Sequence, residues 1–89
     1  MIYFIQEIDP PYRIKIGFSK NPTRRIAVLS AMLPQTVQIL KIIEGEQLDE
    51  QWLHERWKEY RVYGKREWYY PNPELLDDIN SPDAKILDE

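Results

Sequence analysis

Two short apolar stretches on either side of a proline-rich turn are the feature that most constrains this fold. Ile2 to Ile8 is rich in residues that favour strands, and Arg13 to Phe18 alternates between apolar and other side chains. Between them, Asp9-Pro10-Pro11-Tyr12 predicts a turn, because proline fixes φ and has no amide hydrogen to donate to a sheet. The first 18 residues are therefore predicted to form an antiparallel hairpin.

The second strand of this hairpin has two chemically different faces. Successive side chains of a strand point to opposite sides, so Ile14 and Ile16 share one face while Lys15 and Gly17 share the other. The isoleucines are expected to face a core.

A helix is predicted to begin at Asn21-Pro22, with asparagine as the N-cap and proline at the first helical position. It should continue to about Leu33, where Pro34 ends it. Its inner stripe has helical spacing and consists of Ile26, Leu29 and Leu33.

Two consecutive arginines lie on this helix but point in different directions. Arg25 lies beside the inner stripe, whereas Arg24 points nearly the opposite way. Arg25 is therefore the arginine that can reach a site on the sheet.

The rest of the chain reads as a third strand, a second helix and a short final helix. The strand is Val37 to Ile43, and the second helix runs from Gln47 to about Arg61. A turn or short strand, 62–65, leads into 67–70, and a short helix follows at 74–79. The predicted apolar side of the second helix comprises Leu48, Trp52, Leu53, Trp57 and Tyr60.

Length and composition indicate one small α+β domain over residues 1–80, with an acidic C-terminal tail at 81–89. At 89 residues and 43% hydrophobic, the chain can bury one modest core. The absence of cysteine excludes disulfides and thiolate zinc sites and fits a reducing cytoplasm. No stretch has the roughly 18 apolar residues of a membrane span, and we expect no signal peptide.

The charge is unevenly distributed along the chain. The net charge is −3, which is unusual for a general nucleic-acid binder. Residues 1–42 carry six Lys and Arg against two Asp and Glu, a net charge of +4, and residues 43–89 carry a net −7. A local basic patch can still attract a polyanion, so DNA stays a candidate partner with a small contact area.

The order of these elements and of several short motifs resembles the GIY-YIG endonuclease superfamily. The chain is similar to its short phage-type branch, whose second motif contains Lys-Ile-Gly. The matching segments cover about residues 1–70 and are Ile2-Tyr3-Phe4-Ile5, Lys15-Ile16-Gly17, Asn21-Pro22-Thr23-Arg24-Arg25-Ile26, Leu53-His54 and Glu67-Trp68-Tyr69.

This resemblance implies a three-stranded antiparallel sheet flanked by helices, and a phage or prophage endonuclease that hydrolyses DNA phosphodiester bonds. Glu67 takes the position of the metal ligand, for Mg²⁺ or Mn²⁺, which prefer oxygen ligands. Arg25 takes the position of the essential arginine, whose forked donors suit phosphate oxygens. Either Tyr3 or Lys15 would accept the proton of the attacking water, and His54 could donate or accept one near neutral pH. The basic residues expected along the DNA are Lys20, Arg24, Lys65 and Arg66.

Other interpretations of the same residues stay open. The chain could be a catalytically silent module of this fold that binds nucleic acid or a protein partner. His54 with Glu50 could simply form a polar cluster on a solvated helix face. A free edge strand could pair with a second copy of the chain. The tryptophans Trp52, Trp57 and Trp68 are expected in the core rather than as base-stacking platforms.

Overall fold

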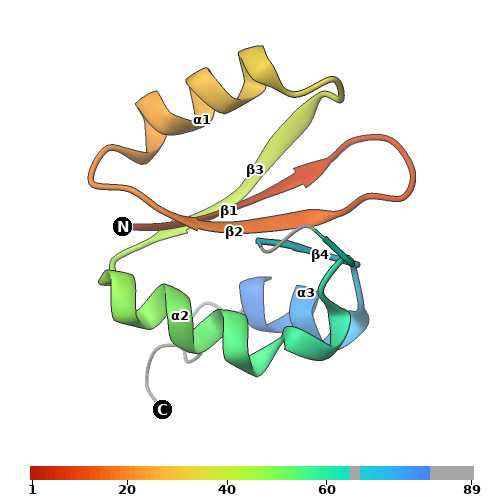
Figure 1. Ribbon diagram of the computed structural model, residues 1–89. Coiled ribbons are helices and arrows are strands. Elements are labelled where there is room, and N and C mark those ends of the chain that lie inside the picture. Colours follow the sequence, from red (N-terminus) through yellow and green to blue (C-terminus); the bar gives the residue numbers. More distant parts are fainter. Residues whose placement is uncertain (65–66, 81–89) are drawn as a thin grey trace.

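The computed structural model describes residues 1–64 and 67–80, which form a sheet of four antiparallel strands between helices. The strands are β1 (Ile2–Glu7), β2 (Ile14–Phe18), β3 (Val37–Ile43) and β4 (Trp68–Tyr69), in the spatial order β3-β1-β2-β4. Figure 1 shows β1 in the interior of this small sheet, directly beside β2 and β3.

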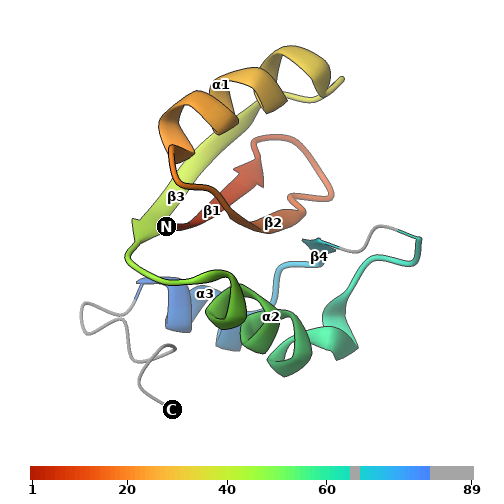
Figure 2. The same ribbon diagram turned by 60° about the vertical axis from the view of Figure 1, so that its left-hand side comes forward.

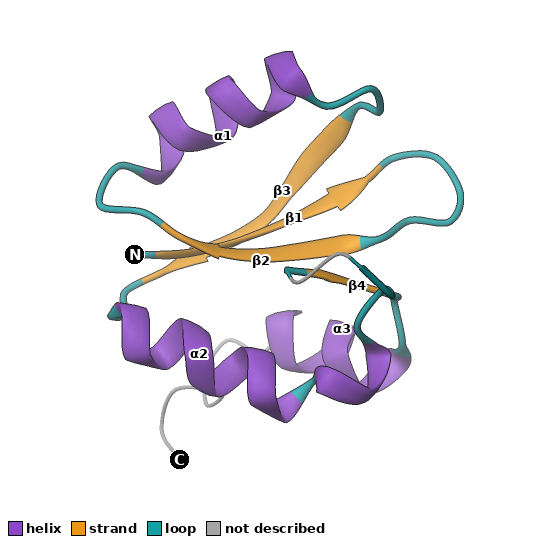
Figure 3. Cartoon of the chain, in the orientation of Figure 1, coloured by secondary structure: helices purple, strands orange, loops and turns teal. Residues whose placement is uncertain are grey.

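Helices cover both faces of the sheet. Helix α1 (Pro22–Met32) lies on one face, and α2 (Gln47–Arg56) and α3 (Pro73–Asn80) lie on the other (Figures 1 and 3). A 3₁₀ turn, η1 (Lys58–Tyr60), follows α2. Seen from a second side, the chain keeps this three-layer arrangement (Figure 2). No helix in the described part of the chain is long and apolar enough to cross a membrane.

The hairpin predicted from the first 18 residues is confirmed. In its register, Tyr3 pairs with Gly17 and Ile5 pairs with Lys15. Lys15 and Gly17 therefore share the face of Tyr3, and Ile14 and Ile16 face the other way, as expected.

Each face of the sheet has its own apolar cluster. On the side of α2 and α3, ten buried residues form the larger cluster, and one of them is the fully buried Leu53. On the side of α1, a smaller cluster joins Tyr3, Ile5 and Ile26, with Leu29 packed against it. Asn21 caps α1 by accepting a hydrogen bond from the Arg24 amide at 3.2 Å, as its position before proline predicted.

Two details of the expected secondary structure were wrong. The sheet has four strands rather than three, because β4 pairs with β2 through Ile14–Tyr69 and Lys15–Trp68. Helix α2 ends at Arg56 instead of about Arg61, and the chain continues as η1. The 3₁₀ turn suits the aromatic pair Trp57 and Tyr60, because side chains three residues apart eclipse in this helix type, and their rings lie 6.1 Å apart.

One residue of the predicted apolar side of α2 is not in the core. Leu48 is 75% exposed, since it lies in the first turn and faces away from the sheet. The predicted acidic tail, 81–89, lies outside the described residues.

Candidate functional site

The site is built around the cross-strand pair of Tyr3 and Gly17. The Tyr3 ring lies directly over Gly17, so a methyl group added there would overlap the ring and hydroxyl, and its separation from Cε2 would be 2.7 Å. Tyr3 is only 1% exposed. Glycine at this position is therefore what allows the tyrosine to lie flat across the sheet.

Arg25, in the first turns of α1, lies close to the Tyr3 hydroxyl. Burial raises the pKa of Tyr3 above its ordinary value, and the nearby Arg25 guanidinium opposes this rise without cancelling it. The Tyr3 hydroxyl is therefore protonated at neutral pH and can donate a hydrogen bond.

Lys15 and Glu67 form an ion pair on the same side of the sheet. The Lys15 side chain is only 9% exposed, whereas the Glu67 side chain is 43% exposed. The pair joins Lys15 Nζ to Glu67 Oε1. The Glu67 backbone carbonyl also accepts a hydrogen bond from the Ile16 amide at 3.1 Å, which holds Glu67 against the edge of β2.

Two polar residues of α2 approach the same strand from the other helical layer. His54 Nε2 lies 3.0 Å from the carbonyl oxygen of Ile16, a distance at which the ring nitrogen donates. Glu50 is one helical turn before His54, and its Oε2 lies 4.0 Å from His54 Nε2. His54 thus lies against β2 rather than on a fully solvated helix face.

Glu50 is the member of this group that was not chosen as a site residue from the sequence. It is only 8% exposed. Burial raises its pKa; His54 and Lys15 act in the opposite direction, while Glu67 adds to the rise. Its i, i+4 spacing to His54 was the available signal, but that spacing alone is also common on solvated helices.

The structure brings together the five predicted catalytic residues from separate segments. Tyr3 and Lys15 share the α1 side of the sheet with Arg25, Glu67 pairs with Lys15 at the edge of β2, and His54 reaches β2 from α2. Burial is the main cause of the raised pKa of Tyr3, and the negative charge of Glu67 adds to the rise.

The predicted DNA-contacting residues are only partly described. Lys20, Arg24 and Arg25 are exposed around the start of α1. Arg24 and Arg25 also line a cavity of about 250 Å³ together with Ser19, Asn21 and Val28. Lys65 and Arg66 lie outside the described residues.

Glu67 is the carboxylate at which a magnesium ion would bind. Mg²⁺ binds through one or two carboxylates plus substrate phosphates and keeps several waters. Glu67 is a partly exposed carboxylate that pairs with Lys15 through Oε1, and Glu50 is a second carboxyl group nearby. Within residues 1–64 and 67–80, no group of three or more His, Cys, Asp or Glu side chains could hold a metal. The residues present therefore fit a sparsely ligated, hydrated Mg²⁺ and do not form a closed metal cage.

Comparison with known proteins identifies a family match. The model of the T5orf172 domain family matches residues 1–81, which include every described element. This is a phage-derived domain found in some endonuclease-like proteins. No curated protein and no solved structure matches the chain.

Proposed function

The chain belongs to the T5orf172 domain family, and we propose that it is a GIY-YIG-type endonuclease that hydrolyses DNA phosphodiester bonds with the help of Mg²⁺ or Mn²⁺. The family favours a phage-type role in cutting or binding DNA. The more specific assignment rests on the side chains around Gly17 and on the motif resemblance.

One observation carries this proposal. Tyr3, Lys15, Arg25 and Glu67 come from β1, β2, α1 and the residue before β4, yet they are gathered at one region of the sheet. A purely structural explanation accounts for the Lys15–Glu67 pair but not for a buried tyrosine hydroxyl beside an arginine that is otherwise exposed.

Glu67 is the residue that would hold the metal ion. When bound, the ion would supply positive charge that stabilises the departing 3′-oxygen and lowers the pKa of a coordinated water. Glu50 would remain outside the ligand set and add negative potential that favours a cation.

The chain's own side chains provide binding and orientation. Arg25 offers parallel N–H donors to the non-bridging phosphate oxygens, where negative charge builds in the transition state. The Tyr3 hydroxyl, protonated because burial raises its pKa, orients the phosphate or the attacking water by donating a hydrogen bond. Lys15, on the neighbouring strand, could accept the water's proton only as the neutral amine, so this role would require its ion pair with Glu67 to be broken.

The test is cleavage of supercoiled plasmid by Arg25→Ala, with Arg24→Ala as the matched control. Both residues are exposed arginines of the same helical turn, but only Arg25 lies beside Tyr3. The proposal predicts metal-dependent nicking that falls at least about a hundredfold in Arg25→Ala, as for loss of a transition-state donor. Arg24→Ala should lose less than tenfold, through weaker DNA binding alone. Equal activity of the two variants would contradict the site assignment.

A second candidate function is supported by the Lys15–Glu67 pair itself. An ion pair at the proposed ligand neutralises the carboxylate and would suit a module that binds DNA or a protein without cutting. Titration with Mg²⁺ followed by NMR separates the two functions. Amide shifts centred on Glu67 favour the endonuclease, and their absence alongside metal-independent partner binding favours the module.

A further inference from the structure

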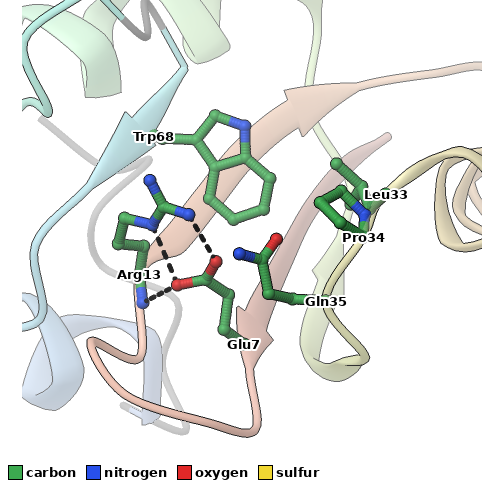
Figure 4. A pocket seen from close by; sticks show the side chains of 6 residues that line it. All are labelled: Glu7, Arg13, Leu33, Pro34, Gln35 and Trp68. Carbon is green, nitrogen blue, oxygen red and sulfur yellow. Dashed lines mark hydrogen bonds and ion pairs between the residues drawn. The ribbon is translucent and has the colours of Figure 1, made fainter.

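A pocket lies on the α1 side of the sheet. Along β2, it lies on the far side of Lys15 as seen from Gly17. Its volume is about 230 Å³. It is lined by Glu7, Arg13, Leu33, Pro34, Gln35 and Trp68, which Figure 4 shows arranged around a common space. None of these residues has a role in the proposed reaction.

The inner wall of the pocket contains an ion pair between Arg13 and Glu7. The Arg13 amide and Nε donate to Glu7 Oε1 at 2.8 and 2.9 Å, and Arg13 Nη2 donates to Oε2 at 2.7 Å (Figure 4). Glu7 is 1% exposed, whereas the Arg13 side chain is 23% exposed. The pair is therefore preorganised and leaves the outer part of the guanidinium accessible.

The remaining walls combine a flat aromatic ring with an amide. Trp68 is half-buried, and the Arg13 guanidinium lies 5.8 Å from its ring centroid. The Gln35 side-chain amide also lines the pocket, and Figure 4 shows it directed toward Glu7 on the side of Trp68. Leu33 and Pro34 provide an apolar side.

The pocket and the candidate site are adjacent along β2 and β4. Arg13 and Lys15 are two residues apart along the same face, or about 6.6 Å at the rise of a strand. Trp68 directly follows Glu67, and Lys15 Nζ lies 6.0 Å from the Trp68 ring centroid. Stacked DNA rises about 3.4 Å per nucleotide, so the pocket lies within about one or two nucleotides of a phosphate held beside Lys15 and Glu67.

We propose that this pocket receives one unstacked nucleobase of the DNA strand next to the phosphate that is cut. The inference rests on the proposed endonuclease function. A base needs a flat apolar surface to stack on and donors and acceptors along its edge, and Trp68 and Gln35 provide them side by side. The exposed part of Arg13 can contact the adjoining backbone phosphate. Trp68 is thereby a ligand-contacting residue and not only a core residue.

The experiment measures binding rather than cleavage, with chelator present throughout. Fluorescence anisotropy compares a short labelled single strand of mixed sequence with the same strand carrying abasic residues. The wild-type chain is compared with Trp68→Ala and with Gln35→Leu, which keeps the side-chain size. Tyr63→Ala and Gln38→Leu are controls, because both residues are exposed and lie outside the pocket.

The proposal predicts that the wild-type chain binds the intact strand at least about fivefold more tightly than the abasic strand, as expected for one stacked base. Trp68→Ala and Gln35→Leu should reduce this preference while keeping the affinity for the abasic strand, and the controls should retain it. No preference for the intact strand, or a preference that both pocket variants keep, would overturn the inference. Because no cleavage is measured, a failure of the catalytic proposal would leave this result unaffected, and the reverse also holds.

Discussion

Replacing Gly17 with alanine should damage both stability and the candidate site through a single contact. The added methyl group would lie within 2.7 Å of Tyr3 Cε2 and nearer still to the ring tip. Ordinary carbon–carbon contacts are about 3.5–4.0 Å, so the ring would have to retreat by about 1 Å. Tyr3 is 1% exposed and packs with Ile5 and Ile26, so the ring has no solvent-filled space into which it can move.

The cost of this overlap is expected to be about 2 kcal/mol of unfolding free energy, within the range for added methyl groups in tightly packed cores. For a domain of this size, that corresponds to a fall in Tm of about 8–16 °C. If the Tyr3 hydroxyl orients the reacting groups, a displacement of about 1 Å would also lower the cleavage rate about a hundredfold.

A double-mutant cycle isolates the contact. Urea unfolding would be measured for Gly17→Ala, Tyr3→Leu, and the double variant. Gly17→Ala should cost about 2 kcal/mol in the wild-type background but less than about 0.5 kcal/mol beside Tyr3→Leu, because the ring that it meets is gone. Additive effects of the two substitutions would refute the proposed contact.

Three further predictions concern the buried carboxylates and the core. The pKa of Glu7 is lowered chiefly by hydrogen bonds from Arg13. The stability that ionised Glu7 contributes is therefore complete above the ordinary carboxyl pKa of about 4.3 and is lost as pH falls through the lower pKa of the folded state. In urea titrations, Glu7→Gln should cost about 2 kcal/mol of unfolding free energy at pH 7 and much less near pH 2. Glu50 should behave in the opposite sense, because burial raises its pKa. The Glu50→Gln variant should become more stable relative to the wild-type chain as pH rises from about 4.3 through the pKa of Glu50 in the folded state. A stability difference that does not change with pH would contradict this. Leu53→Ala should lower the unfolding free energy by about 2–5 kcal/mol, since Leu53 is fully buried, and a loss below 1 kcal/mol by thermal or urea unfolding would show that the core can collapse around the gap.

Local patterns were enough to predict most of the fold. Apolar alternation and the proline turn located the hairpin, and Asn21-Pro22 located the start of α1, because these signals act within a few residues. The two-residue strand β4 was missed as a strand, since so short a segment has no periodicity of its own. Its pairing with β2 depends on contacts with Ile14 and Lys15, far away in the sequence.

In the candidate site, too, some features could be predicted from the sequence and others depend on distant contacts. The family resemblance selected Tyr3, Lys15, Arg25 and Glu67, and helical geometry separated Arg25 from Arg24. The Lys15–Glu67 ion pair joins positions 52 residues apart and could not be read from spacing. The burial of Glu50 likewise depends on how α2 lies against β2, which helical periodicity does not fix.

The most direct test of the central claim is plasmid cleavage by Glu67→Gln beside Glu74→Gln, across a Mg²⁺ titration and with chelator. Glu74 is an exposed glutamate on α3 and serves as the matched control. The account predicts metal-dependent nicking by the wild-type chain and Glu74→Gln, and its loss in Glu67→Gln. Nicking by Glu67→Gln at the wild-type rate, or nicking that persists in chelator, would contradict the assignment of Glu67 as the metal ligand of an endonuclease.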